Sequence, residues 1–240
     1  MTNKILSHIL EAKKNDQQKL AILIDPDKMS LKDVKGKVNI IERSEVDIIL
    51  VGGSLLFSDH LDALLLEIKK YTRLPVVLFP GNVIQISPHA DGILFLSLIS
   101  GRNPEYLIGN QVIAAPILKQ TSLEIIATSY LLIESGRETT ASYISNTKPI
   151  PRDKQDIAMA TALAGEMMGH RLVYLDGGSG AQKPVPADLI EQVAKHSKNP
   201  IIVGGGIRTK EQLQTAYKAG ATMVVIGTAF EENNQFLNKL

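Results

Sequence analysis

The residues best suited to chemistry in this sequence follow short apolar runs, and many of them are glycines. Gly204-Gly205-Gly206 comes directly after the run 201–203, and Gly227-Thr228 comes directly after the run 223–226. Glycine lets backbone N–H groups approach an anion closely, and a capped helix that begins just beyond such a loop adds its dipole. The two segments therefore predict a phosphate site, with tight turns alone as the alternative.

A third donor-rich segment runs from Tyr174 to Gly180, at the end of another apolar run. Its backbone amides and the Ser179 hydroxyl are suited to bind more of the same ligand. Asp176 stands where the run ends, and a carboxylate there can accept hydrogen bonds from ligand hydroxyls or remove a proton. The alternative for Asp176 is that it only caps the loop.

The segment Asp25-Pro26-Asp27-Lys28 follows the first apolar run and brings two carboxylates and an amine together. Mg²⁺ in proteins takes one or two carboxylates and completes its coordination with water and substrate phosphates. Asp25 is the candidate ligand, and Ser54, at the end of the next run, is the candidate second oxygen. An Asp-Pro turn without a metal is an equal alternative.

Eight apolar, β-branched runs must position these residues, and most of them end in Gly, Asp, Pro or Ser. Such runs are typical of strands buried on both faces, as in parallel sheets. Most gaps carry helical patterns, such as a capping box at Thr209 and Gln212 and a stop at Gly220. Alternating strands and helices predict one (β/α)₈ TIM barrel over residues 1–240, with its active site at the carboxyl ends of the strands. The eight runs are 20–24, 48–51, 76–79, 93–96, 125–133, 172–175, 201–203 and 223–226.

Two gaps depart from this alternation. Too few residues separate Pro80 from Gly92 for a regular crossover helix, and Pro88 lies among them. We therefore expect a short irregular segment in place of the helix after strand three. Residues 134–156 are predicted to form a polar loop ahead of a helix at 157–168.

Composition excludes several classes of protein. The chain has 240 residues, 44% of them hydrophobic, with 26 Lys+Arg against 25 Asp+Glu and no Cys. A net charge of +1 argues against a dedicated nucleic-acid binder, and the lack of Cys removes disulfides and thiolate chemistry. The run 92–100 is far shorter than the roughly 20 residues that cross a bilayer, and the first residues lack a signal-peptide pattern. We expect a soluble cytoplasmic protein and leave a peripheral membrane contact open.

Taken together, the segments resemble the geranylgeranylglyceryl phosphate synthase family and the related heptaprenylglyceryl phosphate synthases. VGGGIR alone is common to many phosphate-binding barrels, whereas the ordered combination is specific and covers nearly the whole chain. The length and the segment RNPEYLIG favour the larger subgroup. The matching segments are LIDPDK (23–28), VGGS (51–54), FPGN (79–82), SGRNPEYLIG (100–109), YLDGGSGA (174–181), VGGGIR (203–208) and IGT (226–228).

The resemblance implies a prenyltransferase of ether phospholipid biosynthesis. The 3-hydroxyl of sn-glycerol 1-phosphate attacks C1 of a prenyl diphosphate, with geranylgeranyl diphosphate the leading candidate, and diphosphate leaves. Mg²⁺ on Asp25 and Ser54 would bind that diphosphate, with Asp176 and Tyr174 catalytic. Apolar residues of the 80–100 region are expected to wall the prenyl groove, and Arg102 is a candidate diphosphate contact. The implied sn-glycerol 1-phosphate contacts are Tyr174, Leu175, Asp176, Gly177, Gly178, Ser179, Gly180, Gly205, Gly206, Gly227 and Thr228.

The resemblance also implies a homo-oligomer, either a dimer or a hexamer.

This chain departs from the family pattern in one place. The family usually has Glu and Ala where this chain has Asp176 and Gly177. Asp is one methylene shorter, which predicts a reduced rate or a slightly shifted ligand. The alternatives are another phosphate-binding barrel enzyme acting on a phosphosugar, and a weakly catalytic binding protein that retains the fold.

Overall fold

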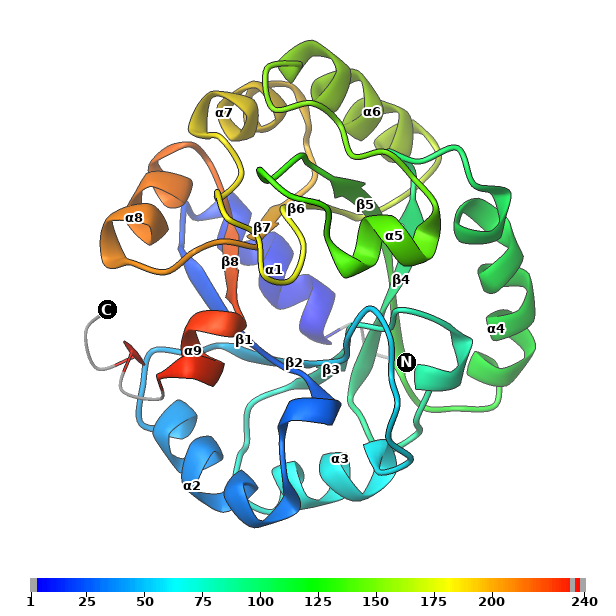
Figure 1. Ribbon diagram of the computed structural model, residues 1–240, viewed down its shortest axis with the longest axis vertical. Coiled ribbons are helices and arrows are strands. Elements are labelled where there is room, and N and C mark those ends of the chain that lie inside the picture. The colour runs from blue at the N-terminus through cyan, green and yellow to red at the C-terminus, as the bar shows by residue number, and fades with distance from the viewer. Residues whose placement is uncertain (1–3, 234–235, 238–240) are drawn as a thin grey trace.

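The computed structural model describes residues 4–233 and 236–237 and shows a closed barrel of parallel strands (Figure 1). The strands pair in sequence order, and β8 closes the barrel against β1. The predicted barrel is confirmed, and each predicted run forms a strand with ends shifted by at most two residues. The strands are β1 Lys19–Ile24, β2 Ile48–Val51, β3 Val76–Leu78, β4 Gly92–Leu98, β5 Glu124–Leu132, β6 Leu172–Asp176, β7 Ile201–Gly204 and β8 Met223–Ile226.

Helices surround the barrel and cover the outward faces of its strands (Figure 1). In α8 the Thr209 hydroxyl accepts the Gln212 N–H at 3.2 Å, as the capping pattern predicts. The Gln212 side chain, however, accepts from the Arg208 N–H at 2.7 Å, one residue before the expected partner. Within the described ranges, no helix has the length and apolar character that a membrane crossing needs. The surrounding helices are α2 Leu31–Glu42, α3 Leu61–Lys69, α4 Asn110–Leu118, α6 Gln155–Met167, α7 Ala187–His196 and α8 Lys210–Lys218.

The amino-terminal end of the barrel is closed by α1, Lys4–Lys14, which crosses behind the strands in Figure 1. Ile5, Leu6 and Ile9 are buried and join the inward-facing side chains of the strands in one core. The buried Glu124 carboxylate accepts the Ile5 and Leu6 N–H groups at 2.8 Å each, which satisfies free donors at the start of the helix. Helix α1 therefore plugs the amino-terminal end of the barrel.

The two irregular gaps have different structures. Between β3 and β4 the described chain forms only a single 3₁₀ turn, Val83–Gln85, so the missing helix is confirmed. The 134–156 segment, in contrast, contains the short helix α5, Thr140–Ser145, and the helix after it begins at Gln155, two residues early. The polar composition of α5 concealed it, although Thr139 and Ser142 form a reciprocal capping box at its start.

Candidate active site

A polar pocket of about 430 Å³ opens at the carboxyl ends of the strands. This volume lies in the range of small-molecule sites. The barrel brings the predicted segments from β1, β2, β6, β7 and β8 together around one space, although they are far apart in sequence. The predicted residues that line it are Asp25, Ser54, Tyr174, Asp176, Gly178, Ser179, Gly180, Gly205, Gly206, Gly227 and Thr228.

Two predicted contacts, Leu175 and Gly177, do not line this pocket. Side chains alternate along a strand, so Tyr174 faces inward while Leu175 packs outward in the layer between sheet and helices. The Gly177 N–H donates to the carbonyl oxygen of Gly204 at 3.0 Å and is used within the fold. Leu175 and Gly177 are therefore the two residues of the 174–180 segment that do not line the pocket, and their contact with a ligand stays a prediction.

Glycine is required at Gly205 by both conformation and space. Its φ is +80°, a left-handed value that other residues rarely adopt. A Cβ on Gly205 would lie 2.8 Å from the Gly177 nitrogen and 2.9 Å from Asp176 Oδ1. The loops after β6 and β7 thus pack backbone against backbone, which leaves amide groups rather than side chains to form this wall.

Asp176 is a buried carboxylate held by two hydrogen bonds. Its Oδ2 accepts the Tyr130 hydroxyl at 2.6 Å, and its Oδ1 accepts the Gly178 N–H at 2.7 Å. Burial raises the pKa of Asp176 above its ordinary value, and these two donors only partly oppose that effect. Asp176 is therefore a stronger base than a solvated carboxylate, and each oxygen keeps a lone pair for a ligand.

Three aromatic rings, those of Phe79, Tyr130 and Tyr174, pack against one another beside Asp176. Tyr130 and Tyr174 meet edge to face with 5.6 Å between ring centroids, and Phe79 stacks on Tyr174 at 5.1 Å. Burial, together with the nearby Asp176 carboxylate, raises the pKa of both tyrosines well above the ordinary value. The two phenols stay protonated, so Tyr174 fits a hydrogen-bond donor in the site rather than a base.

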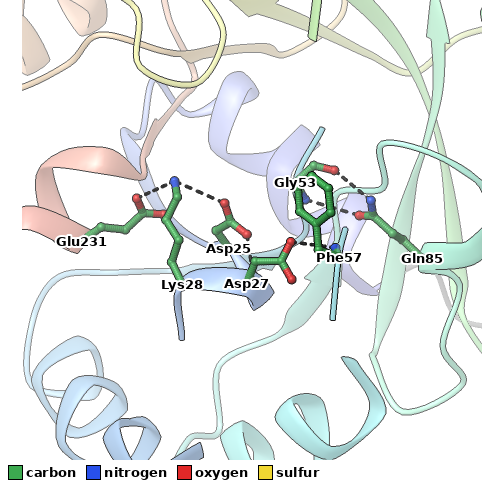
Figure 2. Close-up of polar contacts among 7 residues, drawn as sticks. All are labelled: Asp25, Asp27, Lys28, Gly53, Phe57, Gln85 and Glu231. Carbon is green, nitrogen blue, oxygen red and sulfur yellow. Dashed lines mark hydrogen bonds and ion pairs between the residues drawn. The ribbon is translucent and has the colours of Figure 1, made fainter. Parts of the chain in front are cut away.

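The turn after β1 places Asp25 in the lining of the pocket, where it points toward Lys28 (Figure 2). Asp25 caps the 3₁₀ turn Pro26–Lys28, and its Oδ1 accepts the Asp27 N–H at 3.1 Å. Its Oδ2 lies 3.2 Å from Lys28 Nζ, which also contacts Glu231 Oε2 at 3.0 Å. The Asp-Pro turn is present, yet the Asp25 carboxylate still lines the pocket.

These residues fit a hard cation whose coordination is shared with a substrate. Asp25 offers one carboxylate, and a Cβ placed on Gly53, next to Ser54, would lie 3.4 Å from Asp25 Oδ1. The positions described contain no group of three or more His, Cys, Asp or Glu that could bind a metal by themselves. Mg²⁺ suits such a sparse donor set because it commonly keeps waters and substrate phosphates as ligands.

Two residues fix the Ser54 loop, namely Gln85, which the sequence did not single out, and Asp27, whose role there was not foreseen (Figure 2). The buried Gln85 amide donates to the carbonyl oxygen of Gly53 at 2.8 Å and accepts the Gly53 N–H at 3.3 Å. The Asp27 carboxylate accepts the N–H groups of Phe57 and Ser58 at 2.9 Å each. The irregular segment after β3 thus holds the loop after β2 in place.

A second cavity, the apolar groove, runs between β4, α4 and α5. The 80–100 region supplies one wall, as predicted, whereas the wall from α4 and α5 was not foreseen. Arg102 lines neither cavity, and its guanidinium donates to the carbonyl oxygens of Ile99 and Gly101. The groove and the polar pocket share four lining residues, namely Gly53, Ser54, Phe79 and Tyr130. Apolar residues of the groove include Val83, Ile86, Ile93, Phe95, Leu96, Leu98, Ala114, Leu118 and Ile144.

A closed parallel barrel with a glycine-lined pocket at the carboxyl ends of its strands is the architecture of a TIM-barrel enzyme. The sequence matches the PcrB family over residues 13–240. The geranylgeranylglyceryl phosphate synthase of Flavobacterium johnsoniae is 53% identical, over 99% of this chain and 100% of its own. The chain therefore belongs to the PcrB family and is a prenyltransferase of the geranylgeranylglyceryl phosphate synthase type.

Archaeal proteins are also similar. The geranylgeranylglyceryl phosphate synthase of Pyrococcus furiosus is 46% identical, over 88% of this chain and 83% of its own. The crystal structure of the (S)-3-O-geranylgeranylglyceryl phosphate synthase from Thermoplasma acidophilum, in complex with its substrate sn-glycerol-1-phosphate, has 35% identity and a TM-score of 0.92. The matched region covers 98% of this chain and 94% of the Thermoplasma acidophilum chain. The resemblance that the motifs indicated is confirmed.

Proposed function

We propose that the protein transfers a prenyl group from an allylic prenyl diphosphate, geranylgeranyl diphosphate above all, to the 3-hydroxyl of sn-glycerol 1-phosphate. The observation that carries this proposal is the shared wall of the two cavities at Gly53, Ser54, Phe79 and Tyr130. A small phosphorylated polyol suits the polar pocket, and a long hydrocarbon suits the apolar groove. The reacting ends of two such substrates would meet where the cavities join.

The phosphate of sn-glycerol 1-phosphate would bind the loops after β7 and β8. Gly205, Gly206, Gly227 and Thr228 line this side of the pocket. Backbone amides hold an anion without a surplus of lysine and arginine, which agrees with the net charge of +1. The glycerol hydroxyls would then face Asp176 and Tyr174 on β6.

In the reaction, the 3-hydroxyl oxygen forms a bond to C1 of the prenyl group as the bond between C1 and the diphosphate oxygen breaks. Asp176 accepts the hydroxyl proton, and the diphosphate leaves with the bonding electrons. The raised pKa of the Asp176 carboxyl makes it a suitable acceptor for that proton. Because an allylic C1 gains cationic character, a weak hydroxyl nucleophile is sufficient.

Asp25 and Ser54 would hold Mg²⁺ beside the shared wall. When bound, Mg²⁺ neutralises charge that develops on the leaving diphosphate. Two variants test these assignments. Asp176→Asn should lower kcat while sn-glycerol 1-phosphate still binds, as measured by calorimetry; unchanged turnover would remove Asp176 from the role of base. Asp25→Ala should abolish Mg²⁺-dependent activity, and full activity would contradict the metal assignment.

We also propose that the protein acts in ether phospholipid biosynthesis in the cytoplasm and forms a dimer or hexamer. Self-association is supported by the outer side of α4 and the turn before it, where Ile108, Val112, Ile113 and Ile117 are all exposed. Apolar side chains gathered on one side of a surface helix are typical of an interface. The proposed chemistry itself is tested by offering sn-glycerol 1-phosphate with a series of prenyl diphosphates and identifying ether products by mass spectrometry.

A further inference from the structure

Lys28 is a cation in the polar pocket to which the proposed reaction gives no role. Its Nζ lies between two carboxylates, 3.2 Å from Asp25 Oδ2 and 3.0 Å from Glu231 Oε2 (Figure 2). Asp25 follows β1, whereas Glu231 belongs to α9, Thr228–Glu232, which follows β8. All three residues line the pocket.

The Lys28 side chain is more exposed to solvent than the two carboxylates it contacts, so its ammonium group has room to move. The carboxylates are largely buried, with side-chain exposures of 20% for Asp25 and 19% for Glu231, whereas that of Lys28 is 49%. Lys28 therefore carries its ammonium group on a long, flexible side chain, at the solvent side of two largely buried carboxylates.

The pairing creates a conflict that the proposed function must resolve. A lysine on the Asp25 carboxylate competes with any metal ion that uses the same oxygens. At the same time, two carboxylates in a pocket for anionic substrates repel a diphosphate unless a cation offsets them. An ammonium group that moves from Asp25 to the incoming diphosphate would resolve both problems.

We propose that Lys28 is an exchangeable counter-ion: it pairs with Asp25 in the free enzyme, releases Asp25 to the metal ion, and then binds the substrate diphosphate. Glu231 keeps contact with the ammonium in both states and limits how far it moves. This inference rests on the proposed function, since it assumes that Asp25 is a metal ligand. Lys28 then makes the diphosphate contact for which the sequence had indicated Arg102, a residue that lines neither cavity.

The inference predicts two effects of opposite sign for Lys28→Met. The free metal ion should bind more tightly, by about fivefold, because a partly exposed competing ion pair is removed. The metal–diphosphate complex should bind more weakly, by about tenfold, because a charged contact to the anion is lost. Damage to the fold would weaken both, so opposite signs distinguish the proposed role from a structural one.

The test uses Mn²⁺ as a paramagnetic substitute and follows its free concentration by electron paramagnetic resonance, with and without inorganic diphosphate. Lys28→Arg, which keeps the charge, should retain binding of the complex. Lys32→Met removes an exposed lysine from α2 and should leave both affinities unchanged. If Lys28→Met weakens or leaves unchanged the binding of the free ion, or does not weaken that of the complex, the inference is overturned.

The outcome also separates this inference from the function on which it rests. Wild-type protein that binds Mn²⁺ and its diphosphate complex, with Lys28→Met behaving identically, would overturn only the role of Lys28. Wild-type protein that binds neither would overturn the metal site at Asp25 and Ser54, and the inference with it.

Discussion

Replacing Tyr130 with Phe would test the claim that a buried hydrogen bond tunes the catalytic carboxylate. The Tyr130 hydroxyl donates to Asp176 Oδ2 at 2.6 Å; Asp176 is buried, and Tyr130 is partly buried at the edge of both cavities. This bond stabilises the charged carboxylate and lowers its pKa, against the raising effect of burial. Tyr130→Phe removes the donor and keeps the ring, so the pKa of Asp176 should rise further.

The size of the effect follows from the energy of one charge-assisted hydrogen bond. Such a bond contributes about 1.5–3 kcal/mol, and one pKa unit corresponds to about 1.4 kcal/mol. A base must be deprotonated to act, so activity falls as the pH falls through the pKa of Asp176. The acid limb of the pH profile should therefore move to higher pH by about one to two units.

The assay is the pH dependence of kcat/KM for sn-glycerol 1-phosphate, measured with wild type, Tyr130→Phe and the control Tyr143→Phe. Tyr143 is a largely exposed tyrosine of α5, and its variant should keep the wild-type profile. An acid limb that stays in place in Tyr130→Phe, with activity lowered equally at every pH, would refute the role of Asp176 as the base.

Three other substitutions test the buried carboxylate, the Ser54 loop and the exposed side of α4. Burial raises the pKa of Asp176 in the folded state, so the folded protein loses stability as the pH rises through the folded-state pKa of Asp176. Asp176→Asn should therefore raise Tm more at about pH 8 than at about pH 4. Asp156→Asn, at an exposed position, should show no such difference. Gln85→Leu leaves the Gly53 amide without its partner, so it should cost about 1–3 kcal/mol of stability. It should also raise KM for the prenyl diphosphate far more than KM for sn-glycerol 1-phosphate. Equal changes in the two KM values would contradict a specific role of Gln85 in positioning the Ser54 loop. Val112→Lys on α4 should shift the protein to monomers in analytical ultracentrifugation, and an unchanged oligomer would place the interface elsewhere.

The barrel and much of the pocket could be predicted because their signals are local. Each strand is a short apolar run, and Gly205 and Gly206 stand where positive φ values and close backbone packing exclude other residues. The stop at Gly220, with φ of +103°, is also local. These features depend on residue type at one place in the chain, and a single sequence displays them directly.

What the sequence concealed depends on the closure of the barrel. Tyr130 and Asp176 are 46 positions apart, and they meet because β5 and β6 pair in a register that aligns Tyr130 with Tyr174. Gln85 ends a single 3₁₀ turn between β3 and β4, which has no apolar periodicity, so no pattern connected it to Gly53. Helix α5 is short and polar, so no amphipathic pattern marked it, yet Ala141, Ile144 and Ser145 line the groove.

The most direct test of the proposed prenyl transfer is to incubate the protein with sn-glycerol 1-phosphate, geranylgeranyl diphosphate and Mg²⁺ and to quantify both products. We expect one prenyl glyceryl ether, identified by mass spectrometry, for each diphosphate released. Release of diphosphate without ether, or no ether with a prenyl diphosphate of any length, would contradict it.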